Sequence, residues 1–129
     1  MNNETTNKEK IVYFTDLNAW KEAHKLVLSI YQLTKSFPKE ELFALTSQMR
    51  RAAVSITSNI AEGFSRKSYK EKVNFYSMAQ GSLTELQSQL LISRDIGYIS
   101  PEEYNEILAL SIVVHKLLSG LIKSSRNHS

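Results

Sequence analysis

Residues 68–90 read SYKEKVNFYSMAQGSLTELQSQL, and this stretch decides the fold class. It opens with Ser68 and Glu71, spaced as in a capping box, where each side chain accepts a hydrogen bond from the other residue's backbone N–H. Apolar residues then recur at alternating steps of three and four, the spacing of one helical face: Tyr76, Ala79, Leu83, Leu86 and Leu90. The stretch therefore predicts one long helix that begins after Ser68 and ends near Gly97.

Two further helices are predicted before this one. The first runs from about Asp16 to Lys35, with Asp16 as its N-cap, and ends where Phe37-Pro38 leaves the helical region. The second runs from Glu40 to Glu62 and stops at Gly63, since glycine adopts a left-handed C-cap at least cost. The expected apolar stripes are Trp20, Ala23, His24, Val27, Tyr31 and Thr34 on the first, and Leu42, Leu45, Met49, Ala52, Ala53, Ile56 and Ile60 on the second.

The start of the fourth helix is predicted from the run Ser100-Pro101-Glu102-Glu103, in which a serine cap is followed by proline and by acids in the first turn. We expect residues 1–13 to be a polar, disordered leader, residues 14–123 to form the domain, and residues 124–129 to be a short frayed tail. Short connections make successive helices antiparallel neighbours. The predicted fold class is all-α, an antiparallel up-down-up-down four-helix bundle.

Composition narrows the classes of protein that fit. The chain has 129 residues, enough for one domain with its own core, and only 4 Gly and 2 Pro, which is few for a fold rich in turns. It has no Cys, which excludes disulfides, thiolate metal sites and cysteine nucleophiles. The sequence holds no uninterrupted apolar run of about 18 residues and no secretory signal pattern. We therefore expect a cytoplasmic protein with no membrane partner.

Several runs of sequence together resemble one bacterial family. They are Phe14–Leu17, Trp20–His24, Phe37–Glu41, Leu45–Ile56, Ser58–Gly63 and Gly81–Leu86. They resemble the "four helix bundle protein" family, also described as proteins encoded by intervening sequences in large-subunit ribosomal RNA genes, over about Phe14 to Leu121. The resemblance implies an up-down bundle that assembles into a ring-like homopentamer. It also implies a link to nucleic acid, because a related bundle is an accessory subunit of a retroelement reverse transcriptase.

A line of polar residues runs along the second helix opposite its apolar stripe. The family resemblance places Arg51, Ser55, Asn59, Glu62 and Glu85 among its motif positions. Two interpretations stay open: an ordinary solvated face, or a subunit interface whose register is fixed by directional hydrogen bonds.

The third helix also carries more apolar residues than one stripe needs. Phe75 and Met78 lie outside the seam that runs from Tyr76 to Leu90. A central helix of a bundle touches two neighbours, and this alone can widen its apolar face. The alternative is that Phe75 and Met78 belong to a subunit interface.

A basic segment precedes and enters the third helix. It contains Arg66, Lys67, Lys70 and Lys72, with Tyr69 among them. Cations beside a helix N-terminus suit phosphate, and an exposed aromatic ring can stack on a base. The alternative is a solvated loop with no ligand. The segment is a candidate site for RNA or DNA.

Catalytic and metal signals are weak in this sequence. The three histidines, His24, His115 and His128, form no HExxH-like pair, and the chain has no G-x-S-x-G motif. Glu62 and Glu85 form a carboxylate pair if their helices are adjacent, although pairing with Arg51 or capping of polar groups in an interface is expected instead. We therefore expect no catalytic residue, no metal and no cofactor.

The predicted function is a non-enzymatic, homo-oligomeric adaptor or scaffold, pentameric and associated with nucleic acid. The alternative is a module that binds only a partner protein and ignores nucleic acid. Salt-sensitive binding separates the two, because phosphate contacts weaken steeply with ionic strength.

Overall fold

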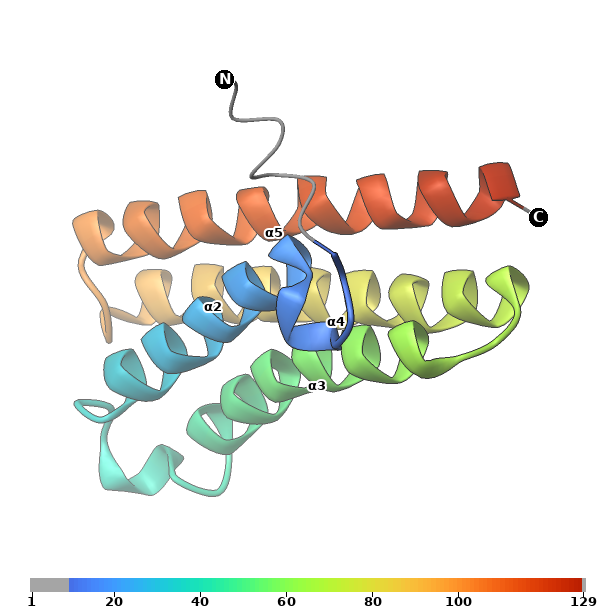
Figure 1. Cartoon of the computed structure of the whole chain (residues 1–129). Helices are drawn as coiled ribbons and strands as arrows, with labels where there is room; N and C mark the ends of the chain where they lie inside the picture. Colours follow the sequence, from blue (N-terminus) through green and yellow to red (C-terminus); the bar gives the residue numbers. More distant parts are fainter. Residues whose placement is uncertain (1–9, 129) are drawn as a thin grey trace.

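The computed structural model describes residues 10–128. Figure 1 shows four helices side by side, with successive helices running in opposite directions, and α2 packs against α5 to close the bundle. The predicted all-α four-helix bundle is confirmed. The elements in chain order are η1 (Phe14–Asp16), α2 (Asn18–Thr34), η2 (Lys39–Glu41), α3 (Leu45–Ser65), α4 (Tyr69–Ile96) and α5 (Pro101–His128).

A single apolar core runs between the four helices. The five residues of the predicted seam on α4, from Tyr76 to Leu90, are all buried. Burial of this apolar surface is the main term that stabilises such a bundle. The large side chains with no exposed surface at all are Leu26, Ile30, Met49, Ile56, Ile60, Leu83, Leu86, Leu90, Val114 and Leu118.

The predicted start and end of α4 and the predicted start of α5 are confirmed. The Ser68 hydroxyl accepts from the Glu71 N–H at 3.1 Å, and Gly97 ends α4 in the left-handed conformation with φ 96°. The next helix begins with a complete capping box. The Ser100 N–H donates to the Glu103 carboxylate at 2.8 Å, and the Glu103 N–H donates to the Ser100 hydroxyl at 3.1 Å.

The predicted bounds of the first helix lie within two residues of α2, but its predicted N-cap was wrong and its predicted face was right only in part. Asp16 lies in η1 and does not cap α2; its carboxylate accepts from the Val12 and Tyr13 N–H groups at 2.9 and 3.0 Å. The predicted stripe is partly buried: Ala23 and Thr34 are buried, and Trp20 and Val27 pack against the core. His24 and Tyr31 of that stripe are exposed. The residues of α2 that enter the apolar core are Ala19, Ala23, Leu26, Ile30 and Leu33.

The prediction for the second helix was wrong at both ends. The turn η2 and the non-helical Ala44 precede α3, so the helix begins at Leu45 and Leu42 is 47% exposed. Gly63 lies inside α3 and is buried. A Cβ atom on it would lie 2.7 Å from Cε1 of Tyr76. Glycine is therefore present at this position to let α4 approach closely.

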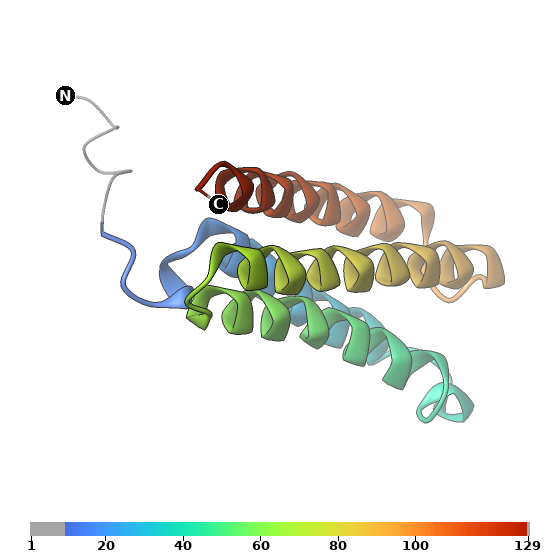
Figure 2. The ribbon, with the colours of Figure 1, turned by 90° about the vertical axis from the view of Figure 1, so that its right-hand side faces the viewer.

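The last helix is longer than predicted. It includes residues 124–128, predicted as a frayed tail, because Ser125 is buried and the His128 ring stacks on Tyr69 with centroids 5.0 Å apart. The predicted leader lies outside the described residues except for Lys10–Tyr13. Figure 2 shows that these four residues project away from the bundle.

By length and composition alone, α5 could cross a membrane, with a mean hydropathy of 1.6 over its most apolar window. In the bundle this helix contributes Ile107, Val114, Leu118 and Ile122 to the shared core. Core helices pass the same test of hydropathy, and this packing accounts for part of the apolar content of α5.

Candidate functional site

The polar line on α3 faces α4 and is partly engaged inside the chain. The hydroxyls of Ser55 and Ser82 hydrogen-bond at 2.8 Å, and the Asn59 amide donates to the Ser55 carbonyl at 2.9 Å. The Ser55–Ser82 bond joins the two helices, and the Asn59 bond lies within α3, so both polar side chains are used inside the single chain. Beside them is an open depression of ≈ 510 Å³, lined by Gln48, Arg51, Ala52, Ser55, Ser82 and Glu85.

The two carboxylates of interest, Glu62 and Glu85, lie far apart. Ser55 is opposite Ser82 in the antiparallel α3–α4 pair, with Glu62 seven residues to one side and Glu85 three residues to the other. At about 1.5 Å of rise per residue this separates the two carboxylates by roughly 15 Å along the helix axes. The conditional carboxylate pair is therefore wrong. Glu62 pairs instead with Arg66, at 2.9 Å.

The apolar surplus on α4 divides into two groups. The Phe75 ring is partly buried under the guanidinium of Arg66, whose Cζ lies 4.5 Å from the ring centroid. Met78, Ile92 and Ile96 are 48%, 45% and 55% exposed. Phe75 is thus used within the chain, while the other three line the outer side of α4 on either side of Glu85.

The predicted basic segment contains side chains that are used within the fold and side chains that are exposed. The Lys72 amine donates to the Phe64 and Gly63 carbonyls at 2.6 and 3.3 Å, so it caps the C-terminus of α3. Partial burial lowers the pKa of Lys72 from its ordinary value. Tyr69 stacks on His128, and Arg66 is engaged by Glu62.

Lys67 and Lys70 complete the segment, and both are exposed. The stack of Tyr69 on His128 brings the end of α5 to the same end of the bundle. Lys123 and Arg126 belong to that end and were missed: Arg126 fell in the expected tail, and Lys123 was the last residue of the expected domain. The buried positions Leu118, Ile122 and Ser125 continue the helical spacing and were the available signal.

Charge is distributed unevenly between the two ends of the bundle. At the end where α4 begins, residues 62–72 and 121–128 contain six basic and two acidic side chains. At the opposite end, residues 35–41 and 94–106 contain six acidic and three basic side chains. The molecule is therefore basic at one end and acidic at the other.

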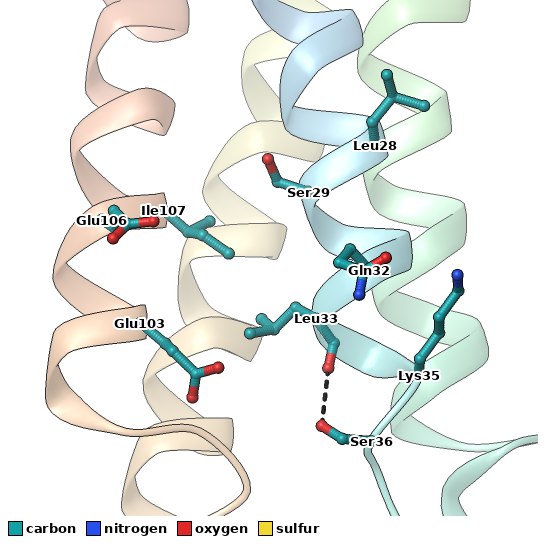
Figure 3. Close-up of a pocket in the computed structure, with 9 residues that line it drawn as sticks. All are labelled: Leu28, Ser29, Gln32, Leu33, Lys35, Ser36, Glu103, Glu106 and Ile107. Atoms are coloured by element: carbon teal, nitrogen blue, oxygen red, sulfur yellow. Dashed lines mark hydrogen bonds between the residues drawn. The ribbon is translucent and has the colours of Figure 1, made fainter.

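A surface hollow of ≈ 670 Å³ lies between α2 and α5 near the acidic end. Figure 3 shows Leu33 and Ile107 between the two helices, Ser29 and Gln32 on the α2 side, and Glu103 and Glu106 on the α5 side. We call this hollow the α2–α5 groove; its remaining lining residues are Leu28, Lys35 and Ser36.

The histidines do not converge on a common site. The His24 ring stacks on Trp20 with centroids 4.8 Å apart, and His128 Nδ1 lies 2.7 Å from the Ser124 carbonyl oxygen. Within residues 10–128, no group of three or more His, Cys, Asp or Glu side chains is placed to hold a metal ion.

The arrangement of antiparallel helices defines the molecule as an all-α four-helix bundle. A family model described as "23S rRNA-intervening sequence protein" matches residues 15–120, and the chain belongs to this family. This confirms the resemblance seen in the sequence.

Among solved structures, the chain is similar to a protein of unknown function from the S23 ribosomal protein family of Bacteroides thetaiotaomicron. The two are 26% identical, the TM-score is 0.76, and the match covers 81% of this chain and 95% of the other. No curated protein matches the chain.

Proposed function

We propose that this chain is a homo-oligomeric adaptor with no catalytic role of its own, and that five copies form a ring. The observation that carries this proposal is the outer side of α4, where Met78, Ile92 and Ile96 remain about half exposed although the core of the bundle is complete. Exposed large apolar side chains that share one helix face are typical of protein–protein contact surfaces. A second copy is the partner that the family resemblance implies.

Polar groups beside this apolar line support the same proposal. Arg51 and Glu85 border one open depression and carry opposite charges. The Glu85 carboxylate also accepts from the Gln89 amide at 3.3 Å, which limits its freedom. Opposite charges held on one face of each copy favour a defined register between two copies.

The test of assembly is the mass in solution, measured by light scattering. We expect wild type to show a multiple of 14.7 kDa and Met78→Glu/Ile92→Glu to shift toward the single-chain mass. Ile112→Glu is the matched control, because Ile112 is similarly exposed at 42% but lies on α5. A wild-type mass of one chain would overturn the proposal.

Nucleic acid is the proposed partner of the basic end. Lys67 and Lys70 are exposed there, and Lys123 and Arg126 belong to the same end. A few cations on one chain bind phosphate weakly, but several copies act together through their high effective concentration. The runner-up function is an adaptor that binds only a partner protein.

Binding of labelled single-stranded RNA and duplex DNA, titrated with salt, separates these two functions. We expect wild type to bind at low salt and to lose affinity steeply as salt rises. Lys67→Glu/Lys70→Glu/Lys123→Glu should abolish binding, while Lys35→Glu/Lys39→Glu at the acidic end is the matched control. Absence of binding by wild type at low salt would leave the protein-only adaptor.

A further inference from the structure

The segment Lys10–Tyr13, which we call the arm, is an unusual exposed element of this bundle. Ile11, Val12 and Tyr13 are consecutive and are 46%, 56% and 68% exposed. Figure 2 shows the arm leaving the bundle, and its residues are not among those of the buried core. Three adjacent large apolar side chains in water are unfavourable for a chain that acts alone.

The base of the arm is held in a fixed conformation. Tyr13 is extended, with φ −120° and ψ 160°, and the Asp16 carboxylate accepts from the N–H groups of both Val12 and Tyr13. These bonds lower the pKa of Asp16, the bond from Tyr13 most. A segment that is already ordered loses less conformational entropy when it binds.

The α2–α5 groove has the features that suit such an arm. Leu33 and Ile107 lie between its two helices, and Leu28 on its border is 56% exposed. Glu103 and Glu106 stand on the α5 side (Figure 3). Leu33 and Ile107 are each 8% exposed, so most of the accessible apolar surface of the groove belongs to Leu28. The charged lining residues are the two carboxylates on α5 and the Lys35 ammonium at the end of α2.

The lengths and charges of arm and groove correspond. Four extended residues span roughly 13 Å, and the eight helical steps from Leu28 to Ser36 span roughly 12 Å. Ile11, Val12 and Tyr13 can meet the apolar part of the groove while Lys10 meets Glu106. The carboxylates of Glu103 and Glu106 thus favour binding of Lys10, which precedes the apolar residues of the arm.

The arm is badly placed to reach the groove of its own chain. It leaves the fold at η1, which packs against α3 and the start of α2, whereas the groove lies on the α5 side of α2 toward the other end of that helix. From Asn18 at the start of α2 to Leu28 at the near end of the groove the helix rises roughly 15 Å, which exceeds the reach of the arm, so the arm cannot lie along the groove of its own chain. Another copy is the better-placed source of the occupant.

We propose that the arm of one copy binds in the α2–α5 groove of a second copy. This proposal rests on the self-assembly proposed above and adds a second contact to it. Each copy offers one arm and one groove at different places, so the contact is heterologous and is repeated from copy to copy. Contacts of this kind close into rings when the rotation between copies allows it.

Disulfide cross-linking tests the proposal directly, because the chain has no cysteine of its own. Ile11→Cys chains are mixed with Ser29→Cys chains, unfolded, refolded together and oxidised. We expect a covalent pair containing one chain of each kind. Ser88→Cys replaces Ser29→Cys in the control, since Ser88 is exposed on α4, away from the groove, and should give little mixed product.

A charge exchange gives an independent readout on assembly. Lys10→Glu and Glu106→Lys should each weaken assembly at low salt by about fivefold, and the two together should restore it. Glu106 is used because Glu103 also closes the cap of α5. Circular dichroism confirms that each variant is folded.

The outcomes separate this proposal from the one it rests on. One outcome is that wild type is an oligomer but the Ile11→Cys and Ser29→Cys chains give no mixed disulfide. Another is that the disulfides mainly join two copies of the same variant. Either result would overturn arm binding and leave self-assembly in place. A wild-type chain that is monomeric at all concentrations would overturn both.

Discussion

The α3–α4 pair and the α2–α5 pair show how differently two contacts in one bundle can be built. In the α3–α4 pair, Gly63 lies directly under Tyr76, and Ser55 bonds Ser82 at 2.8 Å. In the α2–α5 pair, Leu28 stays exposed and a groove of ≈ 670 Å³ remains between the helices. Small residues at contact positions bring α3 and α4 together, whereas Ser29 and Ser36 line the groove that stays open beside α5.

The difference separates the roles of the two helix pairs. A tightly packed contact stabilises the fold, and changes within it cost free energy of unfolding. An open groove contributes less to the stability of the single chain and keeps apolar surface available for another molecule. Substitutions in the α3–α4 contact should therefore change the stability of the fold, whereas substitutions in the α2–α5 groove should change binding to another molecule.

The largest expected contrast is between two leucines. Leu86→Ala removes a fully buried side chain of α4 and should lower the free energy of unfolding by about 3 kcal/mol. Leu28→Ala changes a side chain that is 56% exposed and should cost less than about 0.5 kcal/mol. Urea unfolding at low protein concentration measures both; equal losses would contradict the division.

A glycine pair gives the next contrast. Gly63→Ala places a Cβ 2.7 Å from the Tyr76 ring and 3.0 Å from Phe75 Cβ, and should destabilise the fold by about 2 kcal/mol. Gly81→Ala meets nothing within 4 Å and should stabilise it by about 0.5–1 kcal/mol through helix propensity. Thermal unfolding of both variants checks the signs, and a stabilised Gly63→Ala variant would count against close packing here.

The serine bond between α3 and α4 is a smaller effect. A double-mutant cycle of Ser55→Ala and Ser82→Ala should give a coupling energy of about 1 kcal/mol, the usual net value of a neutral hydrogen bond. Urea unfolding of the four proteins supplies the cycle. Additive losses would show that the two hydroxyls do not interact in solution.

The smallest effect is local and depends on pH. Hydrogen bonds from the Tyr13 and Val12 N–H groups lower the pKa of Asp16 from its ordinary value of 3.8. A lowered carboxyl pKa stabilises the ordered form above pH 3.8, and this contribution disappears as the pH falls through the lowered value. The Val12 and Tyr13 amides should therefore exchange faster with solvent at pH 2 than at pH 5, after correction for intrinsic rates. Asp16→Asn is the control that should show no such step.

The sequence predicted the α4–α5 hairpin better than the α2–α3 hairpin, and the reason is local. Ser68, Gly97 and Ser100 act through bonds and backbone conformations within a few residues, so their effect is visible in a short stretch. Gly63 was misread as a stop because its role depends on Tyr76, which only the folded bundle brings beside it. On α2, two neighbouring stripes have helical spacing, and tertiary packing decided which of their residues are buried.

The sequence could predict which segments hold the candidate sites, but not which side chains within them are exposed. The spacing of Lys and Arg residues identified the basic segment, but no sequence pattern shows that the Lys72 amine reaches back to the Phe64 carbonyl at 2.6 Å. Contacts across a turn divide a charged segment into structural and exposed members. The α2–α5 groove was missed because it joins residues about 70 positions apart in the chain.

Light scattering of the full chain over a range of protein concentrations tests the central claim, self-assembly, most directly. We predict a wild-type mass that is a multiple of 14.7 kDa, five chains in the proposed ring, and a fall toward one chain in Met78→Glu/Ile92→Glu but not in Ile112→Glu. A wild-type mass of 14.7 kDa at every concentration would contradict the claim.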